Sequence, residues 1–497
     1  MFFDSMKDLL NEEKTFTTNG AVAYYTSGKH LLDFNFAVSA LRNKSESEIV
    51  DKYAKVFYED KLTALKYLFY VGDVRGGLGE RRTFKTCFTW LANTQPEITK
   101  ALLPLVAEYT RWDNLWCLLD TNLKDDVIEL VKQQLNEDAK NMMENKPISL
   151  LAKWMPSIYA SSSETKKLAK VFRNKLGMTS EQYRKMLSKL RKYLDVVEVK
   201  MSAKEWDKIK YEAVPSKANL NYNSAFLKND EERRRAYLDA LSKGETKINA
   251  STLQPHEITY KYRRSWEEDT AMESLWKALP NLSIENTLVV RDGSGSMTWT
   301  RCSNSGATPL DVATALSIYM SEHNSGGWKD KFVTFSASPK IVDLSKCKTL
   351  KEKVDLSLRE SDCSNTNIYA TMKLILNTAI RNKMTQEDMP KTIVICSDMQ
   401  FDGKNHGLNK SLFDSIAEEY KSYGYLLPKI CFWNLSGNVN NTVPMQQNDL
   451  GLILCSSFSI QILKMFMSGQ TDPYAILLEE LNSERYQPVE DAVKDII

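Results

Sequence analysis

One acid and two hydroxyls follow a short apolar segment. Residues 288–290 form that segment and predict a buried parallel strand. Asp292, Ser294 and Ser296 come next, on a glycine-containing loop. Open α/β sheets bind ligands at the carboxyl ends of their strands, and hard oxygen donors suit Mg²⁺ or Mn²⁺. Taken alone, these residues are equally consistent with an ordinary Asp-Gly-Ser turn.

The order Asp-x-Ser-x-Ser after a strand resembles the metal-ion-dependent adhesion site (MIDAS) of von Willebrand factor A (vWA) domains. That resemblance implies two more ligands, a threonine on a second loop and an aspartate after a later strand. Thr366 precedes an apolar-periodic helical segment, and Asp398 follows the strand-like residues 392–397. We therefore expect a Mg²⁺ or Mn²⁺ site formed by Asp292, Ser294, Ser296, Thr366 and Asp398.

The residues around this motif favour binding over catalysis. No nucleophile, general acid and general base come together in the sequence, so we predict no catalytic residues and no enzyme. A metal ion with few protein ligands keeps open positions, which a partner's carboxylate or a phosphate oxygen can fill. Trp299 and Arg301 lie in the following insert, residues 298–308, and either read a ligand or are ordinary loop residues.

A local excess of positive charge predicts a polyanion partner. The whole chain has a net charge of +2, but residues 151–266 contain 25 Lys and Arg against 13 Asp and Glu, a net +12. The remainder therefore carries −10. Such a segment is typical of nucleic-acid binding, although a solvated helical face is the alternative. The candidate RNA-binding residues are Lys153, Arg184, Lys185, Lys189, Arg191, Lys192, Arg263 and Arg264.

Two kinds of sequence pattern divide the chain. Residues 1–282 read as successive helices, with capping-box patterns such as Ser45-x-x-Glu48, Thr179-x-x-Gln182 and Ser202-x-x-Glu205. Short connections predict a stacked, HEAT-like helical solenoid with degenerate repeats. Residues 283–497 alternate strand-length apolar runs with helices, which predicts a Rossmann-like, doubly wound parallel sheet. The expected fold class is α plus α/β.

Nearly the whole chain resembles the TROVE family, named for telomerase, Ro and vault proteins, and is similar to a branch of it in large DNA viruses, phages and bacteria. The matching phrases include residues 73–81, 111–115, 150–157 and 255–257. The resemblance implies a helical ring, a vWA domain, and RNA as partner, either small structured RNA or single-stranded 3′ ends. The alternatives are a vWA adaptor that captures a partner's carboxylate, and a viral assembly or virion component.

Composition favours a soluble protein without a membrane partner. Of the 497 residues, 42% are hydrophobic, yet no apolar run approaches the roughly 18 residues of a spanning helix, and the start lacks a signal-peptide pattern. Eight scattered cysteines, without a Cys-x-x-Cys pair, indicate a reducing compartment. We therefore expect the cytoplasm, which is the host cytoplasm if the protein is viral.

Overall fold

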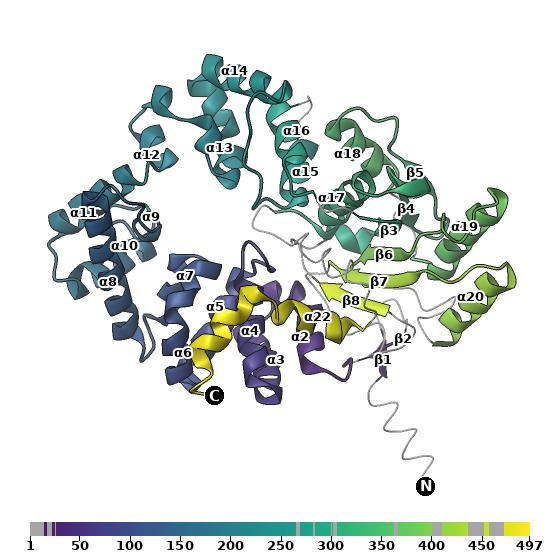
Figure 1. Ribbon diagram of the computed structural model, residues 1–497, viewed down its shortest axis with the longest axis horizontal. Coiled ribbons are helices and arrows are strands. Elements are labelled where there is room, and N and C mark those ends of the chain that lie inside the picture. Colours follow the sequence, from purple (N-terminus) through teal and green to yellow (C-terminus); the bar gives the residue numbers. More distant parts are fainter. Residues whose placement is uncertain are drawn as a thin grey trace, which may run out of the picture. The chain divides into compact units, whose positions relative to one another are not determined.

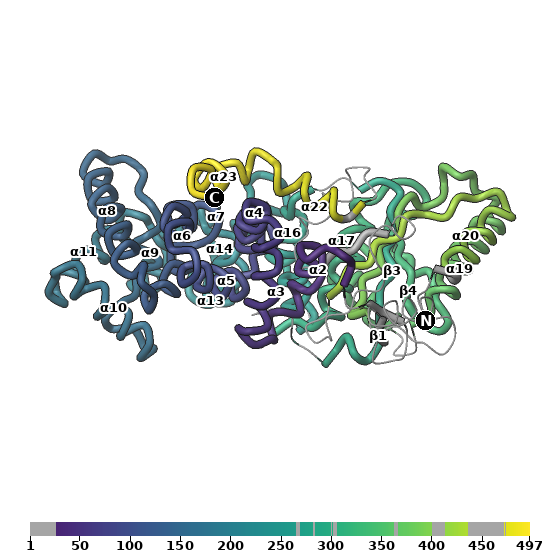
Figure 2. Tube along the Cα trace, turned by 90° about the horizontal axis from the view of Figure 1, so that it is seen from below, coloured from purple at the N-terminus to yellow at the C-terminus, as the bar shows by residue number. Residues whose placement is uncertain are grey.

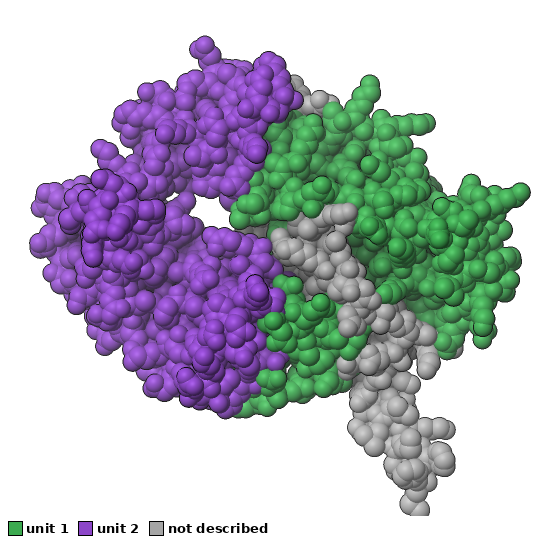
Figure 3. All heavy atoms as spheres, in the orientation of Figure 1, with its two compact units in different colours: residues 1–60, 250–482 green, residues 61–249, 483–497 purple. Residues whose placement is uncertain are grey.

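The computed structural model contains two compact units (Figure 3). Unit 1 comprises residues 1–60 and 250–482, and unit 2 comprises residues 61–249 and 483–497. The chain thus passes from one unit to the other three times. The domain boundary that the sequence predicts between residues 282 and 283 stays a prediction. The structure describes residues 14–16, 22–24, 26–264, 269–281, 284–299, 301, 306–361, 366–399, 410–435, 452–456 and 472–497.

The described residues of unit 2 form helices and contain no strand (Figure 1). Its α-helices are α4 Lys61–Gly72, α5 Arg81–Thr94, α6 Pro96–Leu102, α7 Val106–Tyr109, α8 Lys124–Met143, α9 Leu151–Trp154, α10 Ser163–Lys175, α11 Ser180–Tyr193, α12 Val197–Ser202, α13 Ser216–Asn229, α14 Glu231–Ser242 and α23 Gln487–Val493. Its 3₁₀ helices are η2 Leu103–Leu105, η3 Trp112–Leu118, η4 Trp206–Lys208, η5 Tyr211–Ala213 and η9 Glu484–Tyr486. The C-terminal α23 packs beside α4 and α6 (Figure 2).

Capping side chains explain where several helices begin. Thr179 and Gln182 form the predicted capping box of α11, in which each side chain bonds the other residue's backbone N–H. Ser45 and Glu48 do the same at the start of a helix in unit 1. The capping box predicted at Ser202 is wrong, because Ser202 is the last residue of α12 and a short 3₁₀ helix follows.

Unit 1 combines a sheet with helices. Its strands are β1 Lys14–Phe16, β2 Val22–Tyr24, β3 Thr287–Asp292, β4 Lys331–Phe335, β5 Ile341–Asp343, β6 Thr392–Ser397, β7 Lys429–Asn434 and β8 Leu452–Ser456. Its helices are α2 His30–Ala37, η1 Ala40–Asn43, α3 Glu46–Glu59, α15 Pro255–Arg263, α16 Thr270–Lys277, η6 Gly295–Thr298, α17 Pro309–Glu322, η7 Gly326–Trp328, α18 Leu350–Arg359, α19 Ile368–Arg381, α20 Lys410–Ser422 and α22 Pro473–Leu481. The sequence pattern also predicts a helix at residues 460–467, which lie outside the described residues.

The main sheet has six strands in the order β5-β4-β3-β6-β7-β8. Neighbouring strands are parallel except β4 and β5, which are antiparallel. From the central β3 the chain builds outward through β4 and β5, and it then returns to β6 and builds the other way. The direction of winding therefore reverses between β3 and β6, where ligands of such sheets bind. The predicted α plus α/β class is confirmed.

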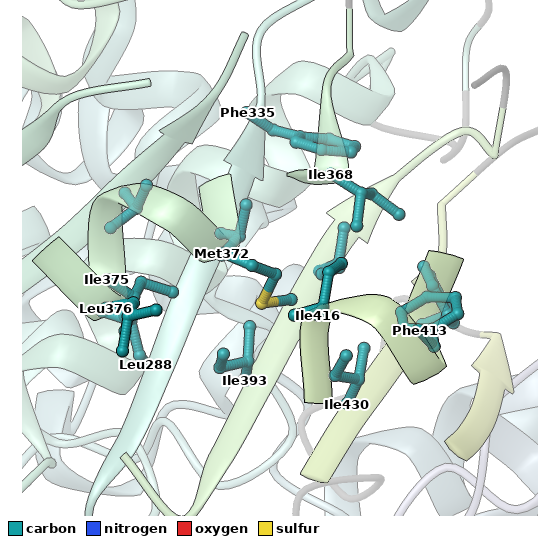
Figure 4. Close-up of a cluster of buried hydrophobic side chains, with 14 of the residues drawn as sticks. Leu288, Phe335, Ile368, Met372, Ile375, Leu376, Ile393, Phe413, Ile416 and Ile430 are labelled. Atoms are coloured by element: carbon teal, nitrogen blue, oxygen red, sulfur yellow. The ribbon is translucent and has the colours of Figure 1, made fainter. Parts of the chain in front are cut away.

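Helices cover both faces of this sheet. On one face, α19 and α20 bury a cluster against alternate residues of the parallel strands (Figure 4). Leu288, Ile393 and Ile430 supply the strand side of that cluster, and Met372 and Ile416 come from the two helices. On the other face α17 packs on β3, β4 and β6. Together these layers fix the carboxyl ends of β3 and β6. No described helix is long and apolar enough to cross a membrane.

Candidate functional site

The pairing of β3 with β6 brings two predicted ligands to one edge. Arg291 pairs with Cys396 in the ladder, so Asp292 and Ser397 follow at adjacent strand ends. The Ser397 hydroxyl donates a hydrogen bond to Oδ2 of Asp292 and accepts one from the backbone N–H of Met399, at 3.1 Å. Asp398 lies between those two residues. The sequence alone did not single out Ser397, because its role depends on the register of β6 against β3.

The loop after β3 adds the two serines. The backbone N–H of Ser294 donates to Oδ1 of Asp292 at 2.8 Å, which folds the loop back over the carboxylate. The hydroxyl oxygens of Ser294 and Ser296 then lie 3.1 Å apart. The 3₁₀ helix η6 begins at Gly295 and holds this turn. The structure therefore gathers Asp292, Ser294 and Ser296 on one loop, as the motif predicts.

Asp292 and Asp398 are both buried, which is costly for two acids. Burial, together with the negative charge of Asp398, raises the pKa of Asp292 to about 7, although hydrogen bonds from Ser397 and Ser294 oppose the rise. The guanidinium of the neighbouring Arg291 donates hydrogen bonds to the hydroxyl of Thr314 in α17 and to the carbonyl of Ser357 in α18. Burial lowers the pKa of Arg291 to about 10.

Thr366 comes from a different element. It is buried immediately before Asn367, whose side chain caps α19 by accepting from the backbone N–H of Ala370 at 2.9 Å. Ile368 then anchors α19 in the sheet core. Thr366 therefore lies at the start of a helix that packs on the sheet, as expected for the second loop.

The donor set fits a hard divalent cation in its chemistry. Within the described residues, no group of three or more His, Cys, Asp or Glu side chains is arranged to hold a metal. The candidate set has two carboxylates, and it depends on hydroxyl oxygens for the rest. A cation between Asp292 and Asp398 would relieve their repulsion, and water would complete an octahedral shell. The ion itself stays a prediction.

The candidate RNA-binding residues of α11 differ in their surroundings. Arg184, Lys185, Lys189 and Lys192 are exposed. Lys185 pairs with Glu181 one turn earlier, at 2.7 Å. Six exposed cations make no side-chain ion pair or hydrogen bond with described residues, and we call them the α10–α11 basic face: Lys166, Lys167, Lys170, Arg184, Lys189 and Lys192.

Arg191 and Lys153 are held within unit 2. The guanidinium of Arg191 donates to the carbonyls of Ala152 and Met155 and to the hydroxyl of Ser157, at 2.7–2.8 Å. Its three donating nitrogens thus fasten α11 to the segment around α9. The ammonium of Lys153 lies 5.7 Å from the centre of the Trp154 ring.

Arg263 and Arg264 belong to unit 1 and end α15. Arg263 pairs with Asp311 at the start of α17, at 2.9 Å. Arg264 lies over the Tyr260 ring, with its guanidinium carbon 4.7 Å from the ring centre. These two arginines therefore lie in the unit that holds the candidate metal ligands, apart from the other basic residues predicted with them.

The comparisons with known proteins assign a family. Two models of domains of unknown function match the chain, DUF2828 at residues 17–110 and 160–283 and DUF7788 at residues 286–494. Uncharacterized protein L728 of Acanthamoeba polyphaga mimivirus is 31% identical over 516 residues, which cover 96% of this chain and 88% of that protein. The chain belongs to the L728 family. In this chain, the DUF2828 match ends at residue 283 and the DUF7788 match begins at residue 286.

Among solved structures, a similar one covers most of the length. The crystal structure of the Deinococcus radiodurans RO (RSR) protein matches with a TM-score of 0.42 and 13% identity. The match covers 89% of this L728 family chain and all of that chain.

Proposed function

We propose that unit 1 contains a metal-dependent binding domain of the vWA type. Its ligands to Mg²⁺ or Mn²⁺ would be Asp292, Ser294, Ser296, Thr366 and Asp398. The observation that carries this proposal is the burial of Asp292 and Asp398 at the ends of adjacent strands, where the winding of the sheet reverses. Two buried acids at a ligand-binding edge call for a cation.

The proposed chemistry is capture of an anionic group, without bond breaking. A bound cation would offer an open coordination position to an oxygen of a partner. The residues of this chain fix the cation's position: Ser397 and the Ser294 backbone orient the Asp292 carboxylate. The Ser397 hydroxyl that donates to the Asp292 carboxylate is itself fully buried, and we assign it to orienting that carboxylate. The protein is therefore proposed to be a binding protein and not an enzyme.

Calorimetry tests the metal site. Titration of the full chain with Mn²⁺ and with Mg²⁺ should give one binding event, and Asp292→Asn should abolish it while circular dichroism stays unchanged. The matched control is Asp343→Asn, which removes an exposed acid from β5 of the same sheet. Equal metal affinity in the Asp292 variant and the wild type would reject the assignment.

We propose RNA binding as the second function, and the observation that favours it is the α10–α11 basic face. Six exposed cations without ion-pair partners among the described residues form a surface that attracts a phosphate backbone. The resemblance of residues 73–81 and 111–115 to TROVE proteins agrees with this proposal. By that resemblance, the helices would form HEAT-like repeats that scaffold structured or misfolded RNA.

A salt titration tests this face. Lys189→Glu with Lys192→Glu should weaken binding of a hairpin RNA with a single-stranded 3′ tail, and it should flatten the dependence of log affinity on log salt. The control variant reverses Arg235 and Lys243 of unit 2, which are exposed and already paired with Glu231 and Asp239. This control variant has the same net charge as the Lys189→Glu and Lys192→Glu variant. Equal losses in the two variants would show nonspecific attraction and reject the proposed face.

A further inference from the structure

A fully buried arginine comes directly before the first candidate metal ligand. Arg291 is the fifth residue of β3, and Asp292 is the sixth. Their side chains leave opposite faces of the sheet, because consecutive residues of a strand alternate. The hydrogen bonds of Arg291 to α17 and α18 place its guanidinium on the face that those helices cover. Arg291 is therefore a neighbour of the candidate site and not a ligand in it.

The contacts of Arg291 are few for a residue that only fastens helices to a strand. Within the described residues, only Nη1 donates hydrogen bonds, to the Thr314 hydroxyl at 3.3 Å and to the Ser357 carbonyl at 2.6 Å. Nε and Nη2 are buried and have no hydrogen-bond partner there. Arg191, by contrast, uses all three of its nitrogens to fasten α11. Buried donors without acceptors cost free energy, so hydrogen bonding alone does not explain an arginine at this position.

The charge of Arg291 is not neutralised by an ion pair with any residue that the structure describes. Its guanidinium carbon lies 5.0 Å from the centre of the Phe332 ring, whose face attracts a cation. Burial lowers the pKa of Arg291 to about 10, and the negative charges of Asp292 and then Glu360 oppose that fall. Arg291 therefore stays protonated at neutral pH, and Asp292 is the acid with which it interacts most strongly.

This positive charge acts on the proposed metal site through the protein interior. Asp292 and Asp398 are buried, and together they would bring two negative charges to a divalent cation. Arg291 adds one positive charge a single residue away, so the loaded site would keep one net positive charge. Salt and water screen buried charges only weakly. The repulsion between Arg291 and a bound cation is therefore substantial, and it grows with the charge of the cation.

We propose that Arg291 is a specificity-determining residue that sets the charge selectivity of the metal site. Its charge lowers the affinity for every cation, and it lowers the affinity for trivalent ions more than that for divalent ions. The loaded site stays positive, and an anionic oxygen of the partner neutralises it. This inference rests on the proposed metal site, and it adds a residue that does not coordinate the ion.

Calorimetry of the full chain with Mn²⁺ and with Tb³⁺ tests the inference. Arg291→Met removes the buried charge, and it should tighten Mn²⁺ binding about tenfold. Because the Coulomb energy is proportional to the charge of the ion, the same variant should tighten Tb³⁺ binding about thirtyfold. A second variant, Arg291→Gln, has an amide that can still donate to the Ser357 carbonyl. It should show gains in the same order.

Two control variants keep the charge of Arg291. Thr314→Val removes the hydroxyl that accepts from Arg291 and changes no charge. Arg234→Met removes a different fully buried arginine, which belongs to α14 in unit 2. Both variants should keep the wild-type affinities for Mn²⁺ and for Tb³⁺. A gain in either control would show that the effect does not come from the charge at position 291.

The outcomes separate the inference from the proposed function. Weaker or unchanged Mn²⁺ binding in the Arg291 variants would overturn the inference and leave the metal site intact. Equal gains for Mn²⁺ and Tb³⁺ would also overturn it, because repacking of the loop would then explain the change without any role for charge. Absence of metal binding in the wild type would overturn both. Thermal unfolding shows which of the two Arg291 variants is folded and serves for the comparison.

Discussion

Arg485 forms a two-point ion pair with Asp73, which precedes it by 412 residues. Asp73 is fully buried, and it also accepts hydrogen bonds from the Tyr486 hydroxyl at 3.1 Å and from the backbone of Arg75 at 2.8 Å. Five residues after Arg485, Glu490 pairs with the buried Lys66 at 2.6 Å. Lys66 of α4 and Asp73 in the loop after α4 are both buried. Through these two ion pairs they hold residues 483–497 within unit 2.

Removing the cation of this pair should destabilise the protein strongly. Arg485→Met would leave the Asp73 carboxylate buried without its positive partner, and we expect the free energy of unfolding to fall by about 2–4 kcal/mol. Urea denaturation followed by circular dichroism measures it. The control is Lys494→Met, since Lys494 pairs with Asp491 on the surface, and its loss should be below about 1 kcal/mol. Similar losses in both variants would contradict a specific role for Arg485.

The loop after Asp73 should tolerate no side chain at Gly77. A Cβ atom there would collide with the carbonyl oxygen of Tyr70, which accepts the backbone N–H of Leu78 at 3.0 Å. We therefore expect Gly77→Ala to cost about 1–3 kcal/mol of unfolding free energy. Gly327→Ala is the control, because an added Cβ there meets open space. Equal thermal midpoints for the two variants would show that the loop has room to adjust.

The metal-free protein should lose stability as the pH rises. The pKa of Asp292 is about 7 in the fold, against about 4 in an unfolded chain, so the folded state binds the proton more tightly. The free energy of unfolding therefore falls as the pH rises. The stabilisation from this proton is complete below about pH 4 and is lost as the pH rises through 7. In EDTA, we expect the unfolding free energy to fall by about 1–3 kcal/mol between pH 5 and pH 8.

The variant Asp292→Asn should remove that part of the pH dependence, and saturating Mn²⁺ should reverse it in the wild type. The control Asp343→Asn should keep the wild-type slope, because hydrogen bonds from Ser345 lower the pKa of Asp343 and it stays ionised from pH 5 to 8. Urea midpoints at four pH values decide between these results. The same slope with and without Asp292 would assign the effect to another group.

Arg191 should matter for stability, and Lys192 should not. Arg191→Gln would remove up to three hydrogen bonds to residues 152–157, so we expect a loss of about 1–3 kcal/mol. Lys192→Gln changes an exposed side chain on the next position of α11 and should stay within about 0.5 kcal/mol. Thermal unfolding of both variants provides the comparison, and the reverse ranking would reject the structural role of Arg191.

Local patterns in the sequence predicted the geometry of the candidate metal loop. An apolar strand, a tight loop and the spacing Asp-x-Ser-x-Ser are all encoded within ten residues, so Asp292, Ser294 and Ser296 were predictable. Thr366 and Asp398 needed the resemblance to vWA domains, because nothing local states which strands become neighbours. Ser397 escaped because its role depends on the register of β6 against β3.

The basic residues show where sequence reasoning stops. Lys189, Arg191 and Lys192 are all cationic. They differ only in their positions around the axis of α11. Tyr183, Leu187 and Leu190 define its buried face, and Arg191 lies at the border of that face. The ion pair between Asp73 and Arg485 has no sequence signal, since no pattern links positions 412 residues apart.

Because the ribosome makes the chain from its N-terminus, the position of Arg485 has a consequence for biosynthesis. The helices around Asp73 are made early, but their cation is translated only 412 residues after Asp73. Unit 2 therefore completes its fold only after the main sheet of unit 1 has been translated, although residues 61–249 of unit 2 are made before that sheet. A chain released before residue 485 would leave the buried Asp73 carboxylate without its cation, so we expect such a product to be degraded and not to persist as a shorter form of the same molecule.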